Sequence, residues 1–208
     1  TTEFLQRFRL KLAINASFFF PFHERHPLDF YPRSGERVEV LGQVIANGVE
    51  YSKPRGGWAV LCILKNRQVQ IPNRLECPPE TLQGVAGSLV LINQGKPQPI
   101  DPAILRQDKP NPRTAVGIDR SGKKMWWVLI DGRQPFYSEG VYLQELVTIL
   151  QDQGIDTALA LDGGGSTTLV MADENGPRLL NSPIHTRIPL RQRYLANHLG
   201  IDAQPIAK

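Results

Sequence analysis

A short segment near the C-terminal end of the chain combines an acid, three glycines and two hydroxyl side chains, Asp162-Gly163-Gly164-Gly165-Ser166-Thr167. Three glycines in a row cost backbone entropy, and they allow a sharp turn that a ligand can approach closely. Successive N–H groups in such a turn can bind an anion, and the two hydroxyls can add donors. Asp162 can accept a proton, bind a sugar hydroxyl or hold a metal. We therefore expect a functional loop; the alternative is a structural turn with Asp162 as its local cap.

Several familiar nucleotide and hydrolase motifs do not match this segment. It lacks the Gly-Lys-Ser/Thr of a Walker loop and the G-x-G-x-x-G of a Rossmann loop, and the chain has no G-x-S-x-G nucleophile elbow. The phosphate loop of the actin and hexokinase type also contains Asp-x-Gly-Gly-Gly-Thr, but that fold needs a second such loop and a far longer chain. These classes are therefore excluded.

Two further segments place charged side chains beside predicted strands. Arg113 joins a long proline-bearing loop, 93–112, to a strand, and a guanidinium can hold a phosphate through two hydrogen bonds. Asp131 and Arg133 flank a glycine at the end of the partner strand. A loop as long as 93–112 is more often functional than idle. Taken alone, however, Arg113 would form a surface ion pair, and the Asp131 segment would be an ordinary turn.

Asn15 interrupts an apolar strand, 12–20, where its amide must find partners. A hydrogen bond in the core and a contact to a ligand are equally open for it. The histidines show no metal-ligand spacing, and each is expected in a loop or on the surface. Among them His185, in the tail loop, is the candidate acid or base; the others are His23, His26 and His198.

The charge pattern and the two cysteines restrict which partners and sites the protein can have. The 24 basic and 20 acidic residues give a net charge of +4, and the basic residues are spread along the chain, so we expect no nucleic-acid partner. The densest basic stretch, 187–193, is either a solvated surface or an anion-binding rim. Apolar runs such as 126–130 are too short for a transmembrane helix. Cys62 and Cys77 form either a disulfide or two buried small hydrophobes, and they lack further ligands for zinc.

Hydrophobic periodicity predicts many short strands and few helices. The clearest helix spans 141–152, where apolar residues share one face and Gly154 follows at the cap position, and a short helix is expected at the start of the chain. Asn47-Gly48 favours a tight hairpin. The expected strands are 12–20, 38–45, 58–64, 68–71, 88–93, 114–119, 124–131, 157–161, 167–171 and 194–199, and 21–37 is expected as a loop. This order predicts an α+β fold, a single domain with a mixed, largely antiparallel β-sheet and few helices.

Five segments, in this order, resemble the phosphodiester glycosidase family. They are AINASFF at 13–19, NPRTAVGID at 111–119, WWVLIDGR at 126–133, ALALDGGGSTTLV at 158–170 and RYLANHLGI at 193–201. The combination is specific, whereas each piece alone would be weak. The resemblance implies one phosphodiester glycosidase-like domain over 1–208, with the N-terminal part of the domain missing or truncated.

The resemblance also implies a set of site residues and a location. The family pattern falls on Asn15, Arg113, Asp131, Gly132, Arg133, Asp162, Gly163, Gly164, Gly165, Ser166, Thr167 and Asn197. One departure is Ala16-Ser17, where the family commonly has two glycines, and larger side chains there would narrow a pocket beside Asn15. Bacterial members are often associated with exopolysaccharide. The implied location is extracytoplasmic: secreted, periplasmic, or membrane-associated through a missing N-terminal segment.

The implied activity is hydrolysis of the glycosidic bond in a sugar-1-phosphate diester. Because the phosphate leaves as a weakly basic anion, stabilising its charge matters more than protonating it. We therefore expect Arg113, Arg133 and the N–H groups around Gly163–Ser166 to bind phosphate, and Asn15 to bind a sugar hydroxyl or Asp162. Asp162 and Asp131 are the candidate catalytic carboxylates, in an order that stays open. A divalent metal joining them also stays open, and no other cofactor is expected.

Two alternative functions remain at this stage. One is a non-catalytic protein that binds anionic polysaccharide in exopolysaccharide or cell-envelope assembly. The other is a glycosidase acting on non-phosphorylated glycans, in which the arginines would bind a carboxylate on the sugar.

Overall fold

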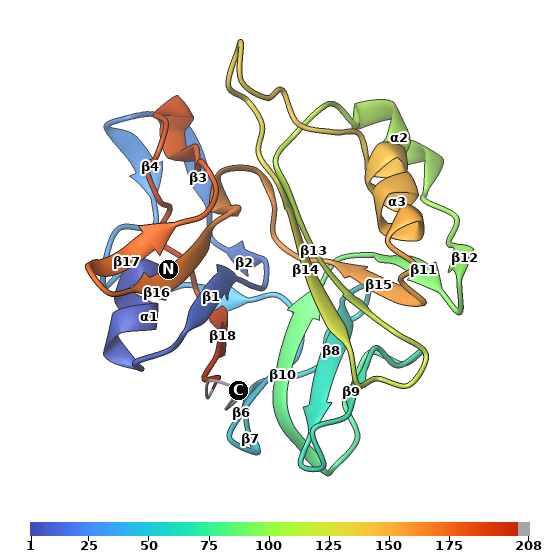
Figure 1. Ribbon diagram of the computed structural model, residues 1–208. Helices are drawn as coiled ribbons and strands as arrows, with labels where there is room; N and C mark the ends of the chain where they lie inside the picture. The colour runs from blue at the N-terminus through green and yellow to red at the C-terminus, as the bar shows by residue number, and fades with distance from the viewer. Residues whose placement is uncertain (204–208) are drawn as a thin grey trace.

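The computed structural model describes residues 1–203, and residues 204–208 of the expected domain lie outside this range. Within residues 1–203, three larger antiparallel sheets and two small two-stranded ones make up most of the fold, with three helices around them (Figure 1). The helices are α1 (Thr2–Arg7), α2 (Pro102–Gln107) and α3 (Leu143–Asp152), and two short turns of 3-10 helix are η1 (Gly164–Ser166) and η2 (His185–Arg187). The predicted α+β fold with few helices is confirmed.

Two five-stranded sheets enclose the main hydrophobic core. One has the order β7-β6-β10-β8-β9 and the other β12-β11-β15-β13-β14. Leu61 and Val85 of the first sheet and Val116 and Leu159 of the second belong to one buried cluster, which excludes water between the sheets. The strands of the first sheet are β6 (Val44–Ala46), β7 (Val49–Ser52), β8 (Ala59–Leu64), β9 (Val69–Gln70) and β10 (Thr81–Gly87). Those of the second are β11 (Val90–Asn93), β12 (Lys96–Pro97), β13 (Arg113–Ile118), β14 (Met125–Ile130) and β15 (Thr157–Ala160).

Helix α3 covers the other face of the second sheet. Its Leu146 and Leu150 are buried in a cluster with residues of β11, β13 and β15. The helix ends where expected, because Gly154 adopts φ +70° and its N–H bonds the carbonyl of Gln151. The next N–H, from Ile155, reaches the carbonyl of Leu150, which completes a Schellman cap. This cap turns the chain directly into β15, the strand that leads to the glycine loop.

A four-stranded sheet with the order β17-β16-β1-β18 lies beside these two sheets (Figure 1). Ile14 and Leu199 of this sheet join the main core, and Leu5 of α1 packs with Ala13 and Val170 at its other face. Its strands are β1 (Leu12–Asn15), β16 (Leu169–Asp173), β17 (Gly176–Leu179) and β18 (His198–Ile201). Two small two-stranded sheets complete the fold, one of β2 (Phe19–Phe20) with β5 (Glu39–Val40), and the other a hairpin of β3 (His23–His26) with β4 (Asp29–Tyr31).

Several segments differ from their sequence-based prediction. The segment 93–112 contains β12 and α2, whose first turn is capped by the Asp101 carboxylate accepting from the Ala103 N–H. The expected loop 21–37 contains the β3–β4 hairpin. Strand β10 is not predicted by the pattern, since two glycines interrupt it. Gly87 is required there, because a Cβ would lie 2.4 Å from the carbonyl oxygen of Ala160.

Cys62 and Cys77 form a disulfide. Cys62 lies in β8 and is fully buried, and Cys77 precedes β10 in the segment that crosses over this sheet. The bond closes a loop with a sequence separation of 15 residues. Among the described residues, no helix is long and apolar enough to cross a membrane.

The disulfide gives a direct test of the first five-stranded sheet. Closing a loop of this length stabilises the folded state by about 3 kcal/mol through the entropy of the unfolded chain. We expect reduction of the disulfide to lower the free energy of unfolding, measured with urea, by about this amount. The double variant Cys62→Ala/Cys77→Ala is the control, since its stability should not respond to the reducing agent. An equal response in both proteins would contradict the prediction.

Candidate active site

A cleft of about 1240 Å³ opens where β15 ends. One side is lined by residues of β2, β3 and η2, and the other by residues of β13, β15, α2 and α3. Its charged lining residues are Glu24, Lys109, Arg113, Arg133, Asp162, Arg187 and Arg193. Apolar side chains, among them Phe18, Trp58, Ile104 and Leu143, form the rest of the wall. The cleft therefore combines a cationic part with an apolar part.

Asp162 follows β15 and is buried, with 8% of its surface exposed. Its main chain is held by Ala16, whose carbonyl accepts from the Asp162 N–H at 3.0 Å, and by the Asn15 side chain, which donates to the Asp162 carbonyl. The Ser166 hydroxyl donates to Oδ2 of Asp162. Burial raises the pKa of Asp162 to about 6, against the opposing effects of Arg193, Ser166, the Gly163 N–H and Arg133. A carboxyl group with this pKa can exchange a proton near neutral pH.

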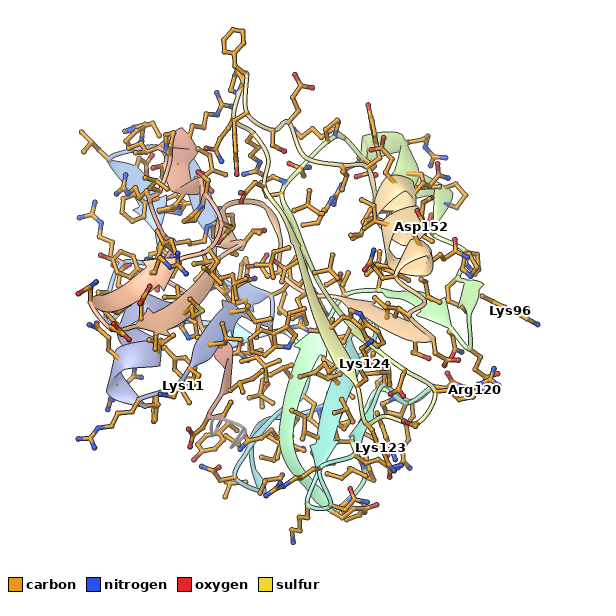
Figure 2. All side chains as sticks on the ribbon, in the orientation of Figure 1. Lys11, Lys96, Arg120, Lys123, Lys124 and Asp152 are labelled. Carbon is orange, nitrogen blue, oxygen red and sulfur yellow. A yellow bond between two sulfur atoms is a disulfide. The ribbon has the colours of Figure 1, made fainter. Side chains whose placement is uncertain are left out.

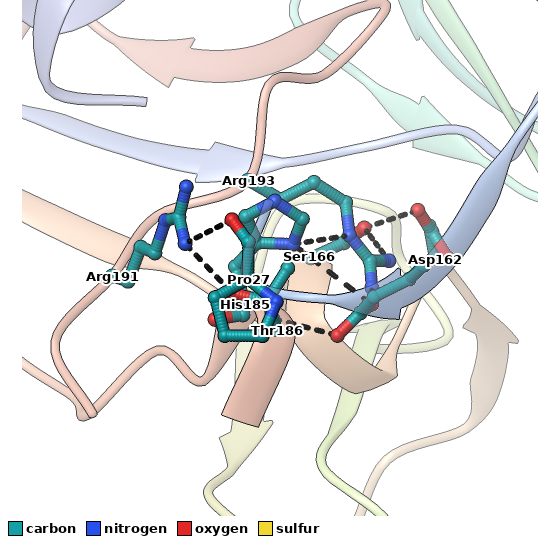
Figure 3. Close-up of polar contacts among 8 residues, drawn as sticks. Pro27, Asp162, Ser166, His185, Thr186, Arg191 and Arg193 are labelled. Carbon is teal, nitrogen blue, oxygen red and sulfur yellow. Dashed lines mark hydrogen bonds and ion pairs between the residues drawn. The ribbon is translucent and has the colours of Figure 1, made fainter. Parts of the chain in front are cut away.

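Arg193 stands at the centre of a buried polar network (Figure 3). Its Nη1 donates to Ser166 Oγ at 2.9 Å, and its Nη2 forms an ion pair with Oε2 of Glu24. Glu24 also accepts from the Thr186 N–H at 2.6 Å, and Nδ1 of His185 lies 3.8 Å from Glu24 Oε2. The network therefore connects the β3–β4 hairpin, through Arg193 and Ser166, to the carboxyl group of Asp162.

The same contacts keep Glu24 ionised. Burial alone would raise the pKa of Glu24, but the neighbouring His185, the charge of Arg193 and the Thr186 N–H together lower it to about 2. The pKa of Glu24 is thus below its ordinary value, whereas the pKa of Asp162 is above its ordinary value. Two carboxyl groups in one site with pKa values pushed apart suit different roles.

Close approaches and one left-handed backbone conformation account for the three glycines of the loop. A Cβ on Gly163 would lie 2.9 Å from the carbonyl oxygen of Pro112, and one on Gly165 would lie 2.5 Å from Nη2 of Arg193. Gly164 has φ +58°, and a Cβ there would lie 2.8 Å from Nη2 of Arg133. The glycines thereby bring two guanidinium groups against the loop backbone.

Most of the loop N–H groups already have partners. Those of Gly164, Ser166 and Thr167 donate to the carbonyls of Pro112, Gly163 and Gly164, respectively. The Gly163 N–H faces the Asp162 carboxyl group. The guanidinium groups are thus better placed than the expected nest of loop N–H groups to receive an anion.

The predicted arginines differ in their partners. Arg113 donates from Nη2 to Asp108 and from Nε to the Val141 carbonyl at 3.0 Å, so much of its capacity is used within the protein. Arg133 donates from Nε to Asn111 at 2.9 Å, and its Nη groups have no hydrogen-bond acceptor within residues 1–203. Burial lowers the pKa of Arg133; Arg193, Arg187 and Arg113 lower it further, while Glu24 opposes the change. This concentration of positive charge disfavours further cations and favours an anion.

Asn15 and Thr167 belong to a buried polar cluster around Thr114. Oδ1 of Asn15 accepts from Thr114 Oγ1 and from the Thr168 N–H, each at 3.1 Å. Thr114 Oγ1 also lies 3.2 Å from Thr167 Oγ1. Of the two alternatives for Asn15, the structure shows the hydrogen bond in the core, including the one to Asp162.

Ala16 and Ser17, where the family commonly has two glycines, lie outside the lining of the cleft. Ala16 is buried in the main core, and the Ser17 hydroxyl accepts from the Asn197 side chain at 3.0 Å. Asn15, Ala16 and Ser17 are not among the residues that line the cleft, so the expected narrowing beside Asn15 stays a prediction.

Asp131 is not brought to Asp162. Its carboxylate accepts from the Ser182 N–H at 2.9 Å, from Asn181 at 2.8 Å and from the Tyr137 hydroxyl at 2.9 Å. Asp131 is absent from the cleft lining and instead joins the loop after β14 to the loop after β17. No group of three or more His, Cys, Asp or Glu side chains among the described residues could hold a metal ion. The residues present therefore do not fit the metal-bridged aspartate pair.

Sequence reasoning missed Glu24 and did not assign a role to Arg187 or Arg193. Glu24 lies in a segment that the pattern predicts as loop, with no motif around it. The two arginines belong to the densest basic stretch, for which an anion-binding rim is one of the two interpretations. His185, the candidate acid or base, is buried beside Glu24 and outside the cleft lining.

A model of the phosphodiester glycosidase family matches residues 8–202. The chain belongs to the phosphodiester glycosidase family. The match covers both the glycine loop and the Arg193 segment, so the cleft lies within the family domain. None of the curated proteins compared with the chain matches it.

Solved structures show that the phosphodiester glycosidase chain shares its fold with distant proteins. The catalytic domain of zebrafish N-acetylglucosamine-1-phosphodiester alpha-N-acetylglucosaminidase, auto-inhibited by its pro-peptide, is 23% identical, with a TM-score of 0.68 over 94% of this chain and 64% of that one. A hypothetical protein from Synechocystis is 17% identical, with a TM-score of 0.52 over 91% and 52%. A Burkholderia pseudomallei protein for which export has been proposed is 12% identical, with a TM-score of 0.61 over 97% and 68%. The chain thus spans less than two thirds of the first two.

Substitution of Gly165 tests the close approach of Arg193. Gly165→Ala would place a methyl group 2.5 Å from the Arg193 guanidinium. Gly165 does not have a left-handed backbone conformation, so backbone strain would not account for a loss of stability. We expect a loss of about 1 to 3 kcal/mol in the free energy of unfolding, because overpacking strains a buried site. Gly56→Ala is the matched control, since nothing lies within 4 Å of its Cβ position. Equal stability of the two variants would contradict this account of the glycine.

The raised pKa of Asp162 predicts a pH dependence of stability. The folded state binds this proton more tightly than the unfolded state, whose carboxyl has the ordinary value of 3.8. Its contribution is therefore fully present below about pH 4 and is lost as the pH rises to about 6, a change of about 3 kcal/mol. Asp162→Asn should not show this loss.

Chemical unfolding of both proteins between pH 3.5 and 7 measures the effect. The free energy of unfolding of Asp162→Asn minus that of the parent should rise across the window from about 4 to 6 and then level off. The lowered pKa of Glu24 has the opposite effect, because its contribution to stability is lost as the pH falls below the ordinary value of 4.5. Both proteins contain Glu24, so this contribution cancels in the difference. A constant difference over the whole window would show that burial does not raise the pKa of Asp162.

Proposed function

We propose that this protein hydrolyses the glycosidic bond of a sugar-1-phosphate diester. Membership of the phosphodiester glycosidase family supports a glycosidase that acts on phosphodiester-linked sugars. The observation that carries the finer proposal is the excess of positive charge beside Asp162. Five cationic side chains and two carboxylates line the cleft, an excess of three, and Asp108 outside the lining neutralises Arg113.

This charge excess suits the leaving group. A phosphodiester carries one negative charge, and the phosphate monoester released from it carries up to two. Cationic side chains that are already in place stabilise the additional charge as it develops, without reorganising at the moment of reaction. Arg133 is the first candidate, because its Nη groups are free of protein acceptors within residues 1–203. Arg187 lines the same cleft and is exposed.

Asp162 is the group proposed to act on the sugar side of the bond. In this scheme a water oxygen forms a bond to the anomeric carbon while the bond from that carbon to the phosphate oxygen breaks. The phosphate departs with the bonding electrons, and the water proton passes to the Asp162 carboxylate. A pKa of about 6 suits a base that works near neutral pH. Asp131 has no part in the step, since its carboxylate is bound elsewhere.

We also propose an extracytoplasmic location. The Cys62–Cys77 disulfide supports it, because structural disulfides persist mainly in oxidising compartments. The similar fold of a Burkholderia pseudomallei protein with proposed export points the same way.

The test is release of free sugar from two matched substrates. One is a phosphodiester, methyl-phospho-N-acetylglucosamine or UDP-N-acetylglucosamine, and the other is a plain aryl glycoside of the same sugar. We expect turnover of the phosphodiester, a loss of turnover in Asp162→Asn with ligand affinity retained, and a fall of about 100-fold in kcat/KM for Arg133→Met. Turnover measured at each pH should show an acid limb near pH 6.

Arg120→Gln serves as the matched control, because Arg120 lies at the outer edge of the molecule and pairs with Asp156 (Figure 2). Its activity should equal that of the parent protein. Preference for the aryl glycoside would favour a glycosidase on non-phosphorylated glycans. Binding of an anionic polysaccharide without any turnover would favour the non-catalytic alternative.

A further inference from the structure

We propose that Glu24 and Arg193 are positioning residues. They orient the Ser166 hydroxyl, and this hydroxyl determines which carboxyl oxygen of Asp162 carries the proton. The inference rests on the proposed role of Asp162 as the base, and it adds a segment far from the glycine loop to the site. Glu24 comes from the β3–β4 hairpin, and Arg193 from the segment before β18. Neither belongs to the motifs of the glycine loop.

The first step of the argument is the direction of the Ser166 hydroxyl. A serine hydroxyl donates one hydrogen bond and can accept two. Nη1 of Arg193 is only a donor, so Ser166 Oγ accepts that bond at 2.9 Å. Ser166 is fully buried, and its neighbouring acceptor is Oδ2 of Asp162. Arg193 thereby turns the serine hydrogen toward Asp162.

The second step concerns the two oxygens of Asp162. Because Oδ2 receives the serine hydrogen, a proton on Oδ2 would face another hydrogen. The proton that Asp162 gains or loses is therefore held at Oδ1. The network selects one of the two carboxyl oxygens for proton exchange, which a serine free to rotate would not do.

The third step is the role of Glu24. Both of its oxygens are occupied, Oε1 by the Thr186 N–H and Oε2 by Arg193. A carboxylate that stays ionised and hydrogen-bonded is not suited to supply a proton. It instead fixes the Arg193 guanidinium, which would otherwise be a buried cation with too few acceptors.

The β3–β4 hairpin is fastened to the same network at two further points. Nη1 of Arg191 donates to the Pro27 carbonyl at 3.2 Å and to Thr186 Oγ1 at 2.9 Å. The Phe30 ring meets the His185 ring edge-on, with centroids 4.8 Å apart. These contacts hold Glu24 at a defined distance from Arg193.

The charges around Asp162 set the expected direction of each substitution. Arg193 and Arg133 favour its ionised form, together with the Gly163 N–H and the Ser166 hydroxyl. Arg187 and Arg113 lie near Arg133, and His185 lies beside Glu24. Loss of Arg193 should therefore raise the pKa of Asp162. Loss of Glu24 leaves Arg193 uncompensated and should lower it.

The experiment is a ¹³C NMR titration of the Asp162 carboxyl, in protein labelled at aspartate Cγ and assigned with Asp162→Asn. We expect Arg193→Gln to raise the midpoint by about one pH unit, and Glu24→Gln to lower it by about half a unit. Asp173→Asn is the matched control, because it removes an exposed ion pair with Arg178. Its Asp162 titration should equal that of the parent.

Opposite shifts support the proposal, because a purely structural role would not move the two variants in different directions. Shifts of the same sign, or none, would overturn it. If Arg193→Gln does not fold, Arg193→Lys replaces it. Lysine keeps the charge but lacks the planar fork whose two Nη groups contact Ser166 and Glu24, so we expect a smaller rise, and no rise counts against the proposal.

The titration separates this inference from the proposed function. It needs no substrate, so it decides the role of Glu24 and Arg193 even if no sugar phosphate is turned over. Where turnover is measured, the acid limb of kcat/KM should move with the titration in each variant. If the acid limb stays in place while the titration midpoint of Asp162 moves, the positioning role of Glu24 and Arg193 is supported, but Asp162 is not the catalytic base.

Discussion

The buried amide of Asn15 ties together the segments on which the cleft depends. It donates to the carbonyl of Asp162 and accepts from Thr114 and from the N–H of Thr168. These partners lie on the second five-stranded sheet and on both sides of the glycine loop, while Asn15 itself ends β1 of the four-stranded sheet. A buried polar group left without its partner costs about 1–3 kcal/mol, so the amide can be satisfied only when the two sheets meet in this arrangement. The position of Asp162 is therefore set by the joining of the sheets.

Given that position, the remaining features of the site follow from the cost of burying a carboxyl group. Asp162 is removed from water, which disfavours its charge, and Ser166 and Arg193 offset part of that cost. Arg193 is itself buried and needs Glu24. The glycines at 163–165 let Arg133 and Arg193 come against the loop without a side chain between them. The result is a carboxyl group that titrates near neutral pH, beside guanidinium groups suited to an anion.

The local elements could be predicted from the sequence where a residue has a specific conformational requirement. Gly154 ends α3 in a left-handed conformation, and Asn47-Gly48 turns between β6 and β7 with both residues at positive φ. The pattern was insufficient for β10 and for the β3–β4 hairpin. In β10, Gly87 packs closely against β15, and Gly84 packs against Cys77 and Ile45, neighbours that are remote in sequence. In the hairpin, short polar strands carry no hydrophobic alternation that would distinguish them from a loop.

The sequence by itself determined the family resemblance and the α+β class, and it singled out Asp162 and its glycine loop as candidates, because these depend on residue types that stand next to one another. Only the tertiary structure decided which other side chains share the cleft. Asp131 stands next to motif residues, yet it is absent from the cleft lining and its carboxylate accepts from the Ser182 N–H, while Arg113 lines the cleft but is paired with Asp108. Glu24 and Arg193 are 169 positions apart and form an ion pair. Such a pair leaves no trace in local spacing, since it forms only when the folded sheets bring two distant segments to one buried carboxyl group.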